Sequence, residues 1–292
     1  MKDFFRKNMK NISPYLFIAP FFMLFIVFFL YPIFYSLVLS FSKWTSGGLE
    51  FVGIQNYLYL LTDPVFWKSL LNTGQILVIQ VPIMLLLACV VAVLINSKHT
   101  KYKALFRLGF FVPVIIDLVT YSLVFSLMFN ERYGIINQFL TSIGMKGIPW
   151  FSNGIWAKVM IAIAMTWRWT GYNSIIILSG LQSIPGTIYE AATIDGANKI
   201  DTFFKITIPM LKPVLLFCMI LSTIGTLQLF TEPYMLTKGG PNNETLTAIY
   251  YIYDRAFGSF KFGLASAGAY IVTTIIGILS YIQLKVSDGG EI

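Results

Sequence analysis

Residues 189–197 read Tyr189-Glu190-Ala191-Ala192-Thr193-Ile194-Asp195-Gly196-Ala197 and form a short polar stretch between two long apolar segments. Two local features predict a helix here. Thr187 and Glu190 fit a T-x-x-E capping box, which would open a helix at Ile188. Gly196 would close that helix, because glycine adopts the left-handed conformation after a helix end at little cost.

A second short helix is expected directly after the first. Asn198, followed by Asp201, can open a helix that runs toward Ile208. The side chains at the end of the first helix are small, which would let another protein approach the backbone closely. These small residues are Ala191, Ala192, Gly196 and Ala197.

The composition of the chain indicates an integral membrane protein. Of its 292 residues, 57% are hydrophobic and 12% are charged, whereas a soluble domain has about 25% charged residues. The formal charge of +8 does not indicate nucleic-acid binding, because Lys and Arg lie at the ends of apolar segments. Cys89 and Cys218 fall inside apolar runs and are expected to be buried thiols, with no disulfide or metal site.

Six apolar runs are each long enough to cross a bilayer, which takes about 20 residues. They are residues 15–41, 69–96, 108–129, 155–184, 210–231 and 262–285. The first run is too long for a signal peptide, and Pro20 and Pro32 are expected to kink or shorten its helix. Runs this long and apolar are helices in lipid. The sequence therefore predicts an all-α membrane protein, one domain over residues 1–292, with a loop at 186–208 between spans four and five.

The distribution of Lys and Arg predicts the orientation of these spans. An even number of spans places both termini on one side of the membrane. The N-terminal segment and the loop at 98–107 give that side an excess of Lys and Arg, which is typical of the cytoplasmic face. Both termini and the loop that contains Glu190 are therefore expected in the cytoplasm.

Two charges lie near the middle of predicted spans, Asp117 in the third and Arg168 in the fourth. A charge at that depth is costly and usually faces a partner or a wet cavity. Asp117 and Arg168 fall at similar depths on neighbouring antiparallel helices. They are expected either to form an ion pair that holds the two spans together or to line a polar wall of a transport pathway, and both can be true.

The Glu190 loop resembles the E-A-A motif of membrane subunits of binding-protein-dependent ABC importers. The matching residues are Glu190, Ala191, Ala192, Gly196, Ile206, Ile208 and Pro209, where Ile208 replaces the usual Leu. Without the resemblance, the loop would be read as an ordinary amphipathic helix. The resemblance implies a cytoplasmic coupling helix that docks into a partner ATPase. The residues that it assigns to this contact are Glu190, Ala191, Ala192, Asp195, Gly196 and Ala197.

A second resemblance lies beyond the fifth span, in Leu236-Thr237-Lys238-Gly239-Gly240-Pro241, Thr245 and residues 251–257. It is similar to the external loop of carbohydrate-importing permeases, such as the first permease subunit of maltose, glycerol-phosphate and oligosaccharide importers. Alone, the Gly-Gly-Pro stretch would be read as a plain turn. The resemblance implies a carbohydrate substrate and favours an oligosaccharide.

The candidate substrate pathway combines residue chemistry with this resemblance. Amides, carboxylates and aromatic faces suit sugars, and Gln228 and Thr231 are spaced to share a helix face. In maltose-importing members the outer half of the fifth span holds sugar, which points to Gln228, Leu229 and Thr231. This chain lacks the paired Asn of those members. The full candidate set is Tyr172, Asn173, Gln228, Leu229, Thr231 and Glu232.

The resemblance also implies the partners of the chain. They are a second homologous permease, two ATPase subunits and an extracellular solute-binding protein that delivers sugar for alternating access in the cell membrane. The sequence has no G-x-x-x-x-G-K-[ST] motif, so ATP and magnesium are expected on the ATPase and no catalytic residue, metal or cofactor on this chain. The alternatives are an ion-coupled secondary transporter that uses Asp117 and Arg168, against which no inverted repeat is visible, and a membrane-embedded assembly factor.

Overall fold

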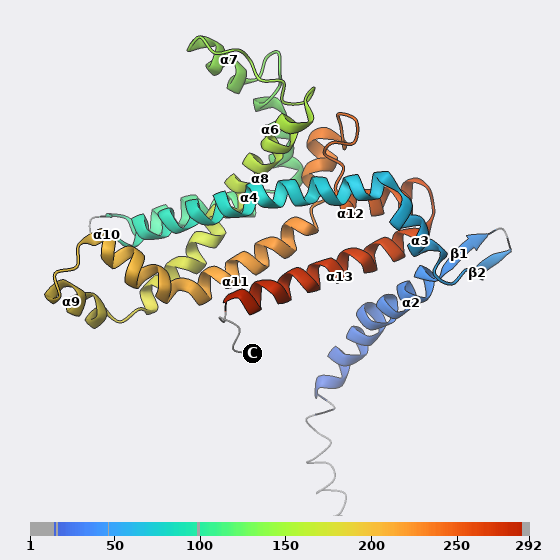
Figure 1. Ribbon diagram of the computed structural model, residues 1–292, viewed down its shortest axis with the longest axis horizontal. Helices are drawn as coiled ribbons and strands as arrows, with labels where there is room; N and C mark the ends of the chain where they lie inside the picture. The colour runs from blue at the N-terminus through green and yellow to red at the C-terminus, as the bar shows by residue number, and fades with distance from the viewer. Residues whose placement is uncertain (1–14, 16, 46, 98–99, 288–292) are drawn as a thin grey trace, which may run out of the picture. The chain divides into compact units, whose positions relative to one another are not determined.

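The computed structural model describes residues 15, 17–45, 47–97 and 100–287, apart from the side chain of Lys199. The described chain is mostly helical (Figure 1). It divides into two compact units. The smaller consists of Met1–Thr62 and Ile252–Ile271, and the larger of Asp63–Tyr251 and Val272–Ile292.

The smaller unit contains a long apolar helix and a short hairpin. Its elements are η1 (Ile26–Leu30, π-helical), α2 (Tyr31–Ser40), β1 (Ser42–Thr45), β2 (Gly48–Phe51), α3 (Gln55–Thr62) and η4 (Asp254–Gly258). The antiparallel hairpin of β1 and β2 was not expected in an all-α chain. Asn56 of α3 joins the hairpin to α2, because the Asn56 side-chain amide donates to the carbonyls of Ser40 and Ser42, both at 2.9 Å.

Neither proline of the first predicted span ends the helix, which runs from Phe17 to Ser40. Pro32 lacks an N–H and its ring crowds the carbonyl four residues earlier. That carbonyl belongs to Phe28, which lies inside η1. A π-helical turn has a wider hydrogen-bond spacing than an α-helix, and so the chain passes Pro32 without a break.

The larger unit is built on three helices that pack together: α4 (Pro64–Asn96), α8 (Gly154–Ser183) and α11 (Ile208–Leu227). Figure 1 shows α4 and α8 side by side. Ala88 and Ala92 of α4 are fully buried in a cluster with Ile177 of α8 and Leu211 of α11. Small side chains at such a crossing let helix backbones approach closely.

The other elements of the larger unit surround these three helices. They are α5 (Lys103–Ile115), α6 (Leu118–Met128), α7 (Ile135–Ser142), α9 (Gly186–Ile194), α10 (Lys199–Thr202), η2 (Phe203–Thr207) and η3 (Pro233–Thr237). The residues of α12 (Ala248–Tyr253) and α13 (Phe262–Ser287) are divided between the two units.

The apolar helices agree with the predicted spans in part. Four described helices are long and apolar enough to cross a membrane: Phe17–Ser40, Pro64–Asn96, Ile200–Leu227 and Phe262–Val286. The run at 108–129 is not one helix, because α5 and α6 meet at an angle of 94°, and it makes a fifth span only if the bent pair is counted as one. The run at 155–184 forms the continuous α8, 30 residues long.

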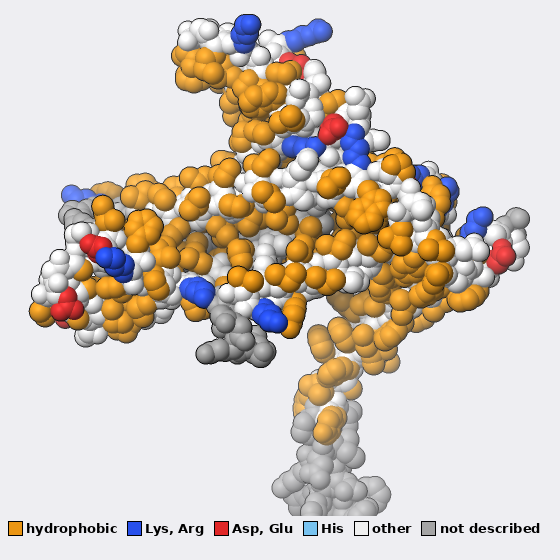
Figure 2. Space-filling model, in the orientation of Figure 1, with side chains coloured by type: hydrophobic (Ala, Val, Ile, Leu, Met, Phe, Trp, Pro, Cys, Tyr) orange, Lys and Arg blue, Asp and Glu red, His pale blue; other side chains and the backbone are white. Residues whose placement is uncertain are grey.

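The surface of the larger unit is consistent with a lipid environment. Large apolar side chains are exposed along its helices, such as Leu86 and Leu94 of α4. Figure 2 shows hydrophobic side chains over much of the visible face, with charged side chains around α9 and α10 and also around α7 and the loop before α12.

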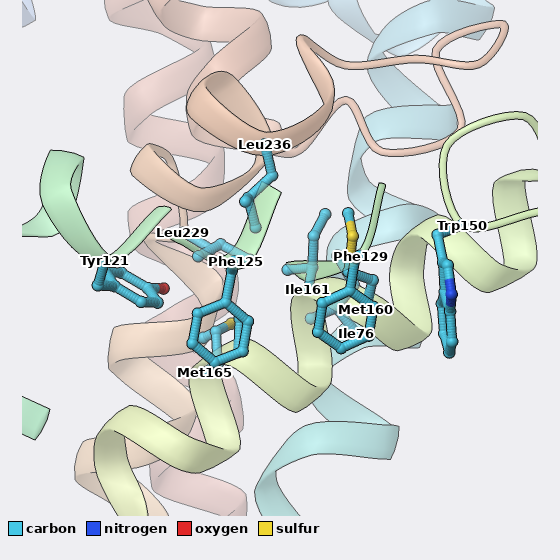
Figure 3. Packing of buried hydrophobic residues seen from close by; sticks show 11 residues of the cluster. Ile76, Tyr121, Phe125, Phe129, Trp150, Met160, Ile161, Met165, Leu229 and Leu236 are labelled. Atoms are coloured by element: carbon cyan, nitrogen blue, oxygen red, sulfur yellow. The ribbon is translucent and has the colours of Figure 1, made fainter. Parts of the chain in front are cut away.

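A second cluster of buried side chains fixes the position of α6 against α8. Tyr121 and Phe125 of α6 and its C-cap, Phe129, pack with Ile161 and Met165 of α8, as Figure 3 shows. Leu229 belongs to the same cluster and comes from the segment after α11 (Figure 3). This packing brings α6, α8 and the end of α11 together around a cavity that is lined by apolar and polar side chains.

Candidate functional site

A cavity of about 360 Å³ lies within the larger unit, between α4, α6, α8 and the segment that joins α11 to η3. All six candidate pathway residues line it: Tyr172, Asn173, Gln228, Leu229, Thr231 and Glu232. Its volume falls in the usual range for small-molecule sites, about 300–1,000 Å³. The structure therefore brings together residues that are far apart in the sequence.

The candidate residues after α11 reach the cavity from a break in the helix and from the first residues of the helical segment that follows it. The prediction that Gln228 and Thr231 share a face of one continuous helix is wrong, because α11 ends at Leu227 and Gln228 is its C-cap. Residues 229 and 230 are not helical. The amides of Gln228 and Leu229 still bond to the last turn, to Ile224 and Thr226. The helix end, not a helix face, aims these side chains into the cavity.

Two buried amides form part of the cavity wall. Gln80 of α4 is only 1% exposed, and its Oε1 accepts a hydrogen bond of 3.0 Å from Thr226 Oγ1. Its Nε2 lies 3.3 Å from the Met84 sulfur, which is a weak acceptor. Asn173 of α8 donates to the carbonyl of Trp169 at 3.0 Å. Gln80 was not predicted as a site residue, although it is one of the amides in the apolar run 69–96.

Glu232 is buried and faces the cavity from the N-terminal side of η3. It is 5% exposed, and its Oε1 accepts a hydrogen bond of 2.7 Å from the Tyr121 hydroxyl. The Arg168 guanidinium lies over the Tyr121 ring, with 5.0 Å between its carbon and the ring centroid. Tyr121 thus connects the carboxylate of the cavity with the cation behind it, a link that the sequence did not reveal.

The expected ion pair between Asp117 and Arg168 does not form; each side chain instead binds backbone at the break between α5 and α6. Asp117 caps α6, since its Oδ1 accepts from the amides of Val119 and Thr120 at 3.0 and 3.1 Å. Arg168 donates to the carbonyls of Ile116 and Val114 at 2.7 and 3.0 Å.

The physical reason lies in the helix ends. The last carbonyls of a helix and its first amides lack partners within the helix, and lipid offers no water to replace them. At the break, a cationic donor satisfies the exposed carbonyls of α5, and an anionic acceptor satisfies the amides of α6. Each charge therefore satisfies backbone groups at the break that a direct ion pair would leave without partners.

The Gly-Gly-Pro loop is fastened to α4 and to the start of α8. Glu244 forms ion pairs with Lys68 at 2.8 Å and with Lys158 at 2.9 Å. Hydrogen bonds from Lys158 and Lys68 hold the pKa of the Glu244 carboxyl below its ordinary value. Asn72 of α4 also donates to the carbonyls of Asn243 and Leu246. The loop is thus positioned by three charged groups and an amide.

The Glu190 loop forms the helix α9, and Gly196 ends it as predicted. Gly196 has a φ of +76°. Its amide donates to the carbonyl of Thr193 at 3.2 Å, and the amide of Ala197 donates to that of Ala192 at 2.9 Å. These two bonds define a Schellman motif. Near Gly196, no other atom of the described chain lies within 4 Å of the place a Cβ would take.

Two details of α9 differ from the prediction. The helix begins at Gly186 and its N-cap, Pro185, provides no side-chain hydrogen bond, so that the capping box of Thr187 and Glu190 is not the device that opens it. Ala192 is 5% exposed and does not belong to the open small surface. Ala191 and Gly196 do remain exposed.

The second helix of the loop opens at Asn198, as expected. Asn198 Oδ1 accepts from the amides of Ile200 and Asp201, both at 2.9 Å. This helix does not end near Ile208 but continues through η2 into α11. The coupling-loop candidates are thereby joined to the same helix that leads to the cavity.

Exposed apolar side chains surround this loop. Ile194 is 86% exposed, Ile200 71% and Phe204 64%. The exposed candidates on the first helix are Glu190, Ala191, Asp195 and Gly196. Large apolar side chains on a polar loop indicate a contact surface rather than a solvated turn.

Comparisons with known proteins give a consistent result. The family of binding-protein-dependent transport system inner membrane components matches residues 4–289. The lactose transport system permease protein LacF of Rhizobium radiobacter is 46% identical over 282 residues, which are 95% of this chain and 94% of LacF. The sulfoquinovosyl glycerol transport system permease protein SmoG of Agrobacterium fabrum is 36% identical over 257 residues, 88% of this chain and 82% of SmoG.

A solved structure shows the same fold. The crystal structure of a bacterial ABC transporter involved in the import of the acidic polysaccharide alginate contains a chain that superposes with a TM-score of 0.85. The two chains are 19% identical, and the match covers 99% of each. This chain therefore belongs to the family of binding-protein-dependent transport system inner membrane components, and it is a membrane-embedded transport component rather than an enzyme.

Proposed function

We propose that this chain is one permease subunit of an ATP-driven ABC importer for a carbohydrate, with an oligosaccharide favoured. The observation that carries the proposal is the cavity, which collects amide, hydroxyl, carboxylate and aromatic side chains at the end of α11. Family membership supports a role in transport. The similarity to LacF, a lactose transport system permease protein, supports a sugar as the substrate.

The proposed assembly has four further parts. A second homologous permease pairs with this chain, two ATPase subunits dock in the cytoplasm, and an extracellular solute-binding protein delivers the sugar. The description of the family, which names dependence on a binding protein, supports the last partner. We place ATP and magnesium on the ATPases, and no cofactor on this chain.

We further propose a single permease domain with six spans and cytoplasmic termini. The family match over residues 4–289 crosses both compact units and supports one domain. In this arrangement the bent pair α5 and α6 is the third span and α8 is the fourth. The loop of α9 and α10 is then cytoplasmic, at the opposite end of α11 from the cavity.

Alternating access fits the connection between these two places. The coupling loop continues without interruption through η2 into α11, and α11 ends at the cavity residue Gln228. A displacement of the loop by the ATPases would therefore move one wall of the cavity. The ion-coupled alternative loses its basis, because Asp117 and Arg168 are both bound to backbone.

Transport by the reconstituted complex tests the cavity. Gln228 is exposed toward the cavity, and Gln228→Ala would remove one hydrogen bond to sugar, typically about 1–1.5 kcal/mol or roughly tenfold in affinity. We expect ATP-dependent sugar uptake into proteoliposomes to fall at limiting sugar, with unchanged yield of purified complex. Glu50→Gln, an exposed position of β2 outside the cavity, is the matched control. Equal uptake by wild type and Gln228→Ala at limiting sugar contradicts a contact at Gln228.

A second experiment tests the coupling loop. Gly196→Asp strains the left-handed position by roughly 1 kcal/mol and places a side chain where this chain leaves open space. The permease pair should still assemble, whereas ATPase co-purification and sugar-stimulated ATP hydrolysis should be lost. Asp201→Asn, which breaks an exposed ion pair with Lys205, should leave both intact. Wild-type coupling in Gly196→Asp would remove α9 from the ATPase contact.

A further inference from the structure

The charge of the residues that line the cavity indicates which charge its ligand can carry. Among the residues that line it, all of which lie in the described chain, Glu232 is the one with a formal charge. The other polar members are neutral: Gln80, Tyr172, Asn173, Ser222, Thr226, Gln228 and Thr231. A ligand in the cavity therefore meets a negative charge and neutral hydrogen-bonding groups.

From this arrangement we infer that Glu232 makes the cavity select neutral sugars and reject sugars that carry a carboxylate or a sulfonate. The inference rests on the proposed function, since it takes the cavity to be the sugar route. It separates this chain from transporters of acidic glycans, a class to which the alginate importer with the same fold belongs.

The Glu232 side chain is held in place by a hydrogen bond. Its Oε1 accepts the 2.7 Å hydrogen bond from Tyr121, and Tyr121 is 1% exposed within the cluster of α6 and α8. Figure 3 shows the Tyr121 hydroxyl on the side of the ring that faces Leu229. One carboxylate oxygen is thus fixed, and the carboxylate cannot turn away from a ligand without losing this bond.

Arg168 does not offset the negative charge in the lining of the cavity. Arg168 is not among the lining residues. Its two terminal nitrogens donate to the carbonyls of Ile116 and Val114, and its guanidinium stacks near the rings of Tyr121 and Trp169. Glu232 lines the cavity and Arg168 does not, and so a ligand can contact the carboxylate but not the guanidinium.

A neutral sugar can donate a hydroxyl to Glu232, and hydrogen bonds to an ionised acceptor are stronger than those between neutral groups. The rings of Trp169, Tyr172 and Phe230 line the same cavity and can cover the C–H face of a sugar. An anionic sugar would place two like charges a few ångströms apart. At a separation of about 4 Å and an effective dielectric constant of about 20, such a pair weakens binding by up to about a thousandfold.

The test uses the complete detergent-purified transporter without its solute-binding protein, so that only the permease selects. The probes are neutral disaccharides, lactose among them, each paired with the derivative in which the C6 carbinol of its non-reducing sugar is oxidised to a carboxylate. Saturation-transfer NMR at millimolar sugar gives relative affinities. For wild type we expect the neutral member of each bound pair to bind at least about tenfold more tightly.

Glu232→Gln is the decisive variant. The amide oxygen can still accept from Tyr121, so the hydrogen bond remains while the charge is removed. We expect the preference for the neutral sugar to fall toward one. Glu50→Gln, which removes an exposed carboxylate of β2 outside the cavity, should keep the wild-type preference.

The outcomes separate the inference from the function on which it rests. Equal binding of neutral and acidic sugars by wild type, or an unchanged preference in Glu232→Gln, overturns the role of Glu232 and leaves the sugar cavity standing. If no probe of either kind competes for the wild-type cavity, the inference falls together with the proposed sugar route. If Glu232→Gln fails to assemble, the wild-type comparison still tests the inference, because equal binding of the neutral and acidic sugars would contradict it.

Discussion

Arg168 and Asp117 illustrate how a charge in a membrane span finds its partner. Both were predicted correctly as unusual residues, but the partner was wrong because a sequence shows no helix break. Ile116 and Asp117 have extended backbone, with ψ of 133° and 140°, and this creates the unpaired carbonyls and amides that the two charges satisfy. The sequence did hold one indication, since Asp at a helix start is a common N-cap.

Substitutions at these two positions should therefore have unequal effects. Arg168→Met leaves two partly buried carbonyls without donors, at up to about 1–3 kcal/mol each, and should lower the unfolding temperature of the purified permease markedly. Asp117→Asn keeps a side chain that caps equally well and should change it little.

The combined variant distinguishes this account from an ion pair. If the two charges were paired, Asp117→Asn would rescue Arg168→Met, because it would remove the charge left behind. We expect no rescue, and a double variant restored to wild-type stability would contradict the backbone account.

At the scale of the elements, the crossing of α5 and α8 depends on one glycine. A Cβ added to Gly171 of α8 would lie 1.6 Å from the carbonyl oxygen of Phe110 in α5. Since that oxygen belongs to the backbone, it cannot move aside without shifting α5. The two helices meet on the same α8 turn that presents Trp169 and Tyr172 to the cavity.

Gly171→Ala should consequently separate the helices. Overpacking of this kind usually costs about 1–3 kcal/mol, and a clash with backbone should reach the upper end. We expect a lower unfolding temperature and a reduced yield of folded permease. Gly74→Ala in α4, where no atom of the described chain beyond the adjacent helix backbone lies within 4 Å of the added Cβ, is the control and should be tolerated. Equal stability of the two variants would show that α5 can shift freely.

The boundaries of the elements show which parts of the fold were predictable. The turn at Gly196 and the cap at Asn198 follow from local backbone chemistry, and both were predicted. The end of α11 at Leu227 was not, because no glycine or proline lies between Leu227 and Glu232 to announce it. Gln80 was missed for a related reason, since a neutral amide in an apolar run could equally face protein.

For the molecule as a whole, composition alone predicted a helical membrane protein. The sequence predicts six apolar spans. The four unbroken apolar helices are long and apolar enough to be recognised from length and composition alone. The bent pair and α8, which carries Lys158 and Arg168, depend on tertiary partners that a hydropathy pattern cannot supply. Likewise, the six pathway candidates came from chemistry and resemblance, but only the fold brings α6 and Tyr121 to Glu232.

The orientation in the membrane remains a prediction at this largest scale, and cysteine labelling of intact cells tests it. Lys and Arg are concentrated on the predicted cytoplasmic side, which places Ile194 inside and Asn242 outside. Ile194 is 86% exposed, and the two native cysteines are buried, so that background labelling should be low. A membrane-impermeant maleimide should modify Asn242→Cys in intact cells and reach Ile194→Cys only after the membrane is opened. Labelling of Ile194→Cys but not Asn242→Cys in intact cells would invert the topology and remove the coupling loop from the side where ATP is hydrolysed.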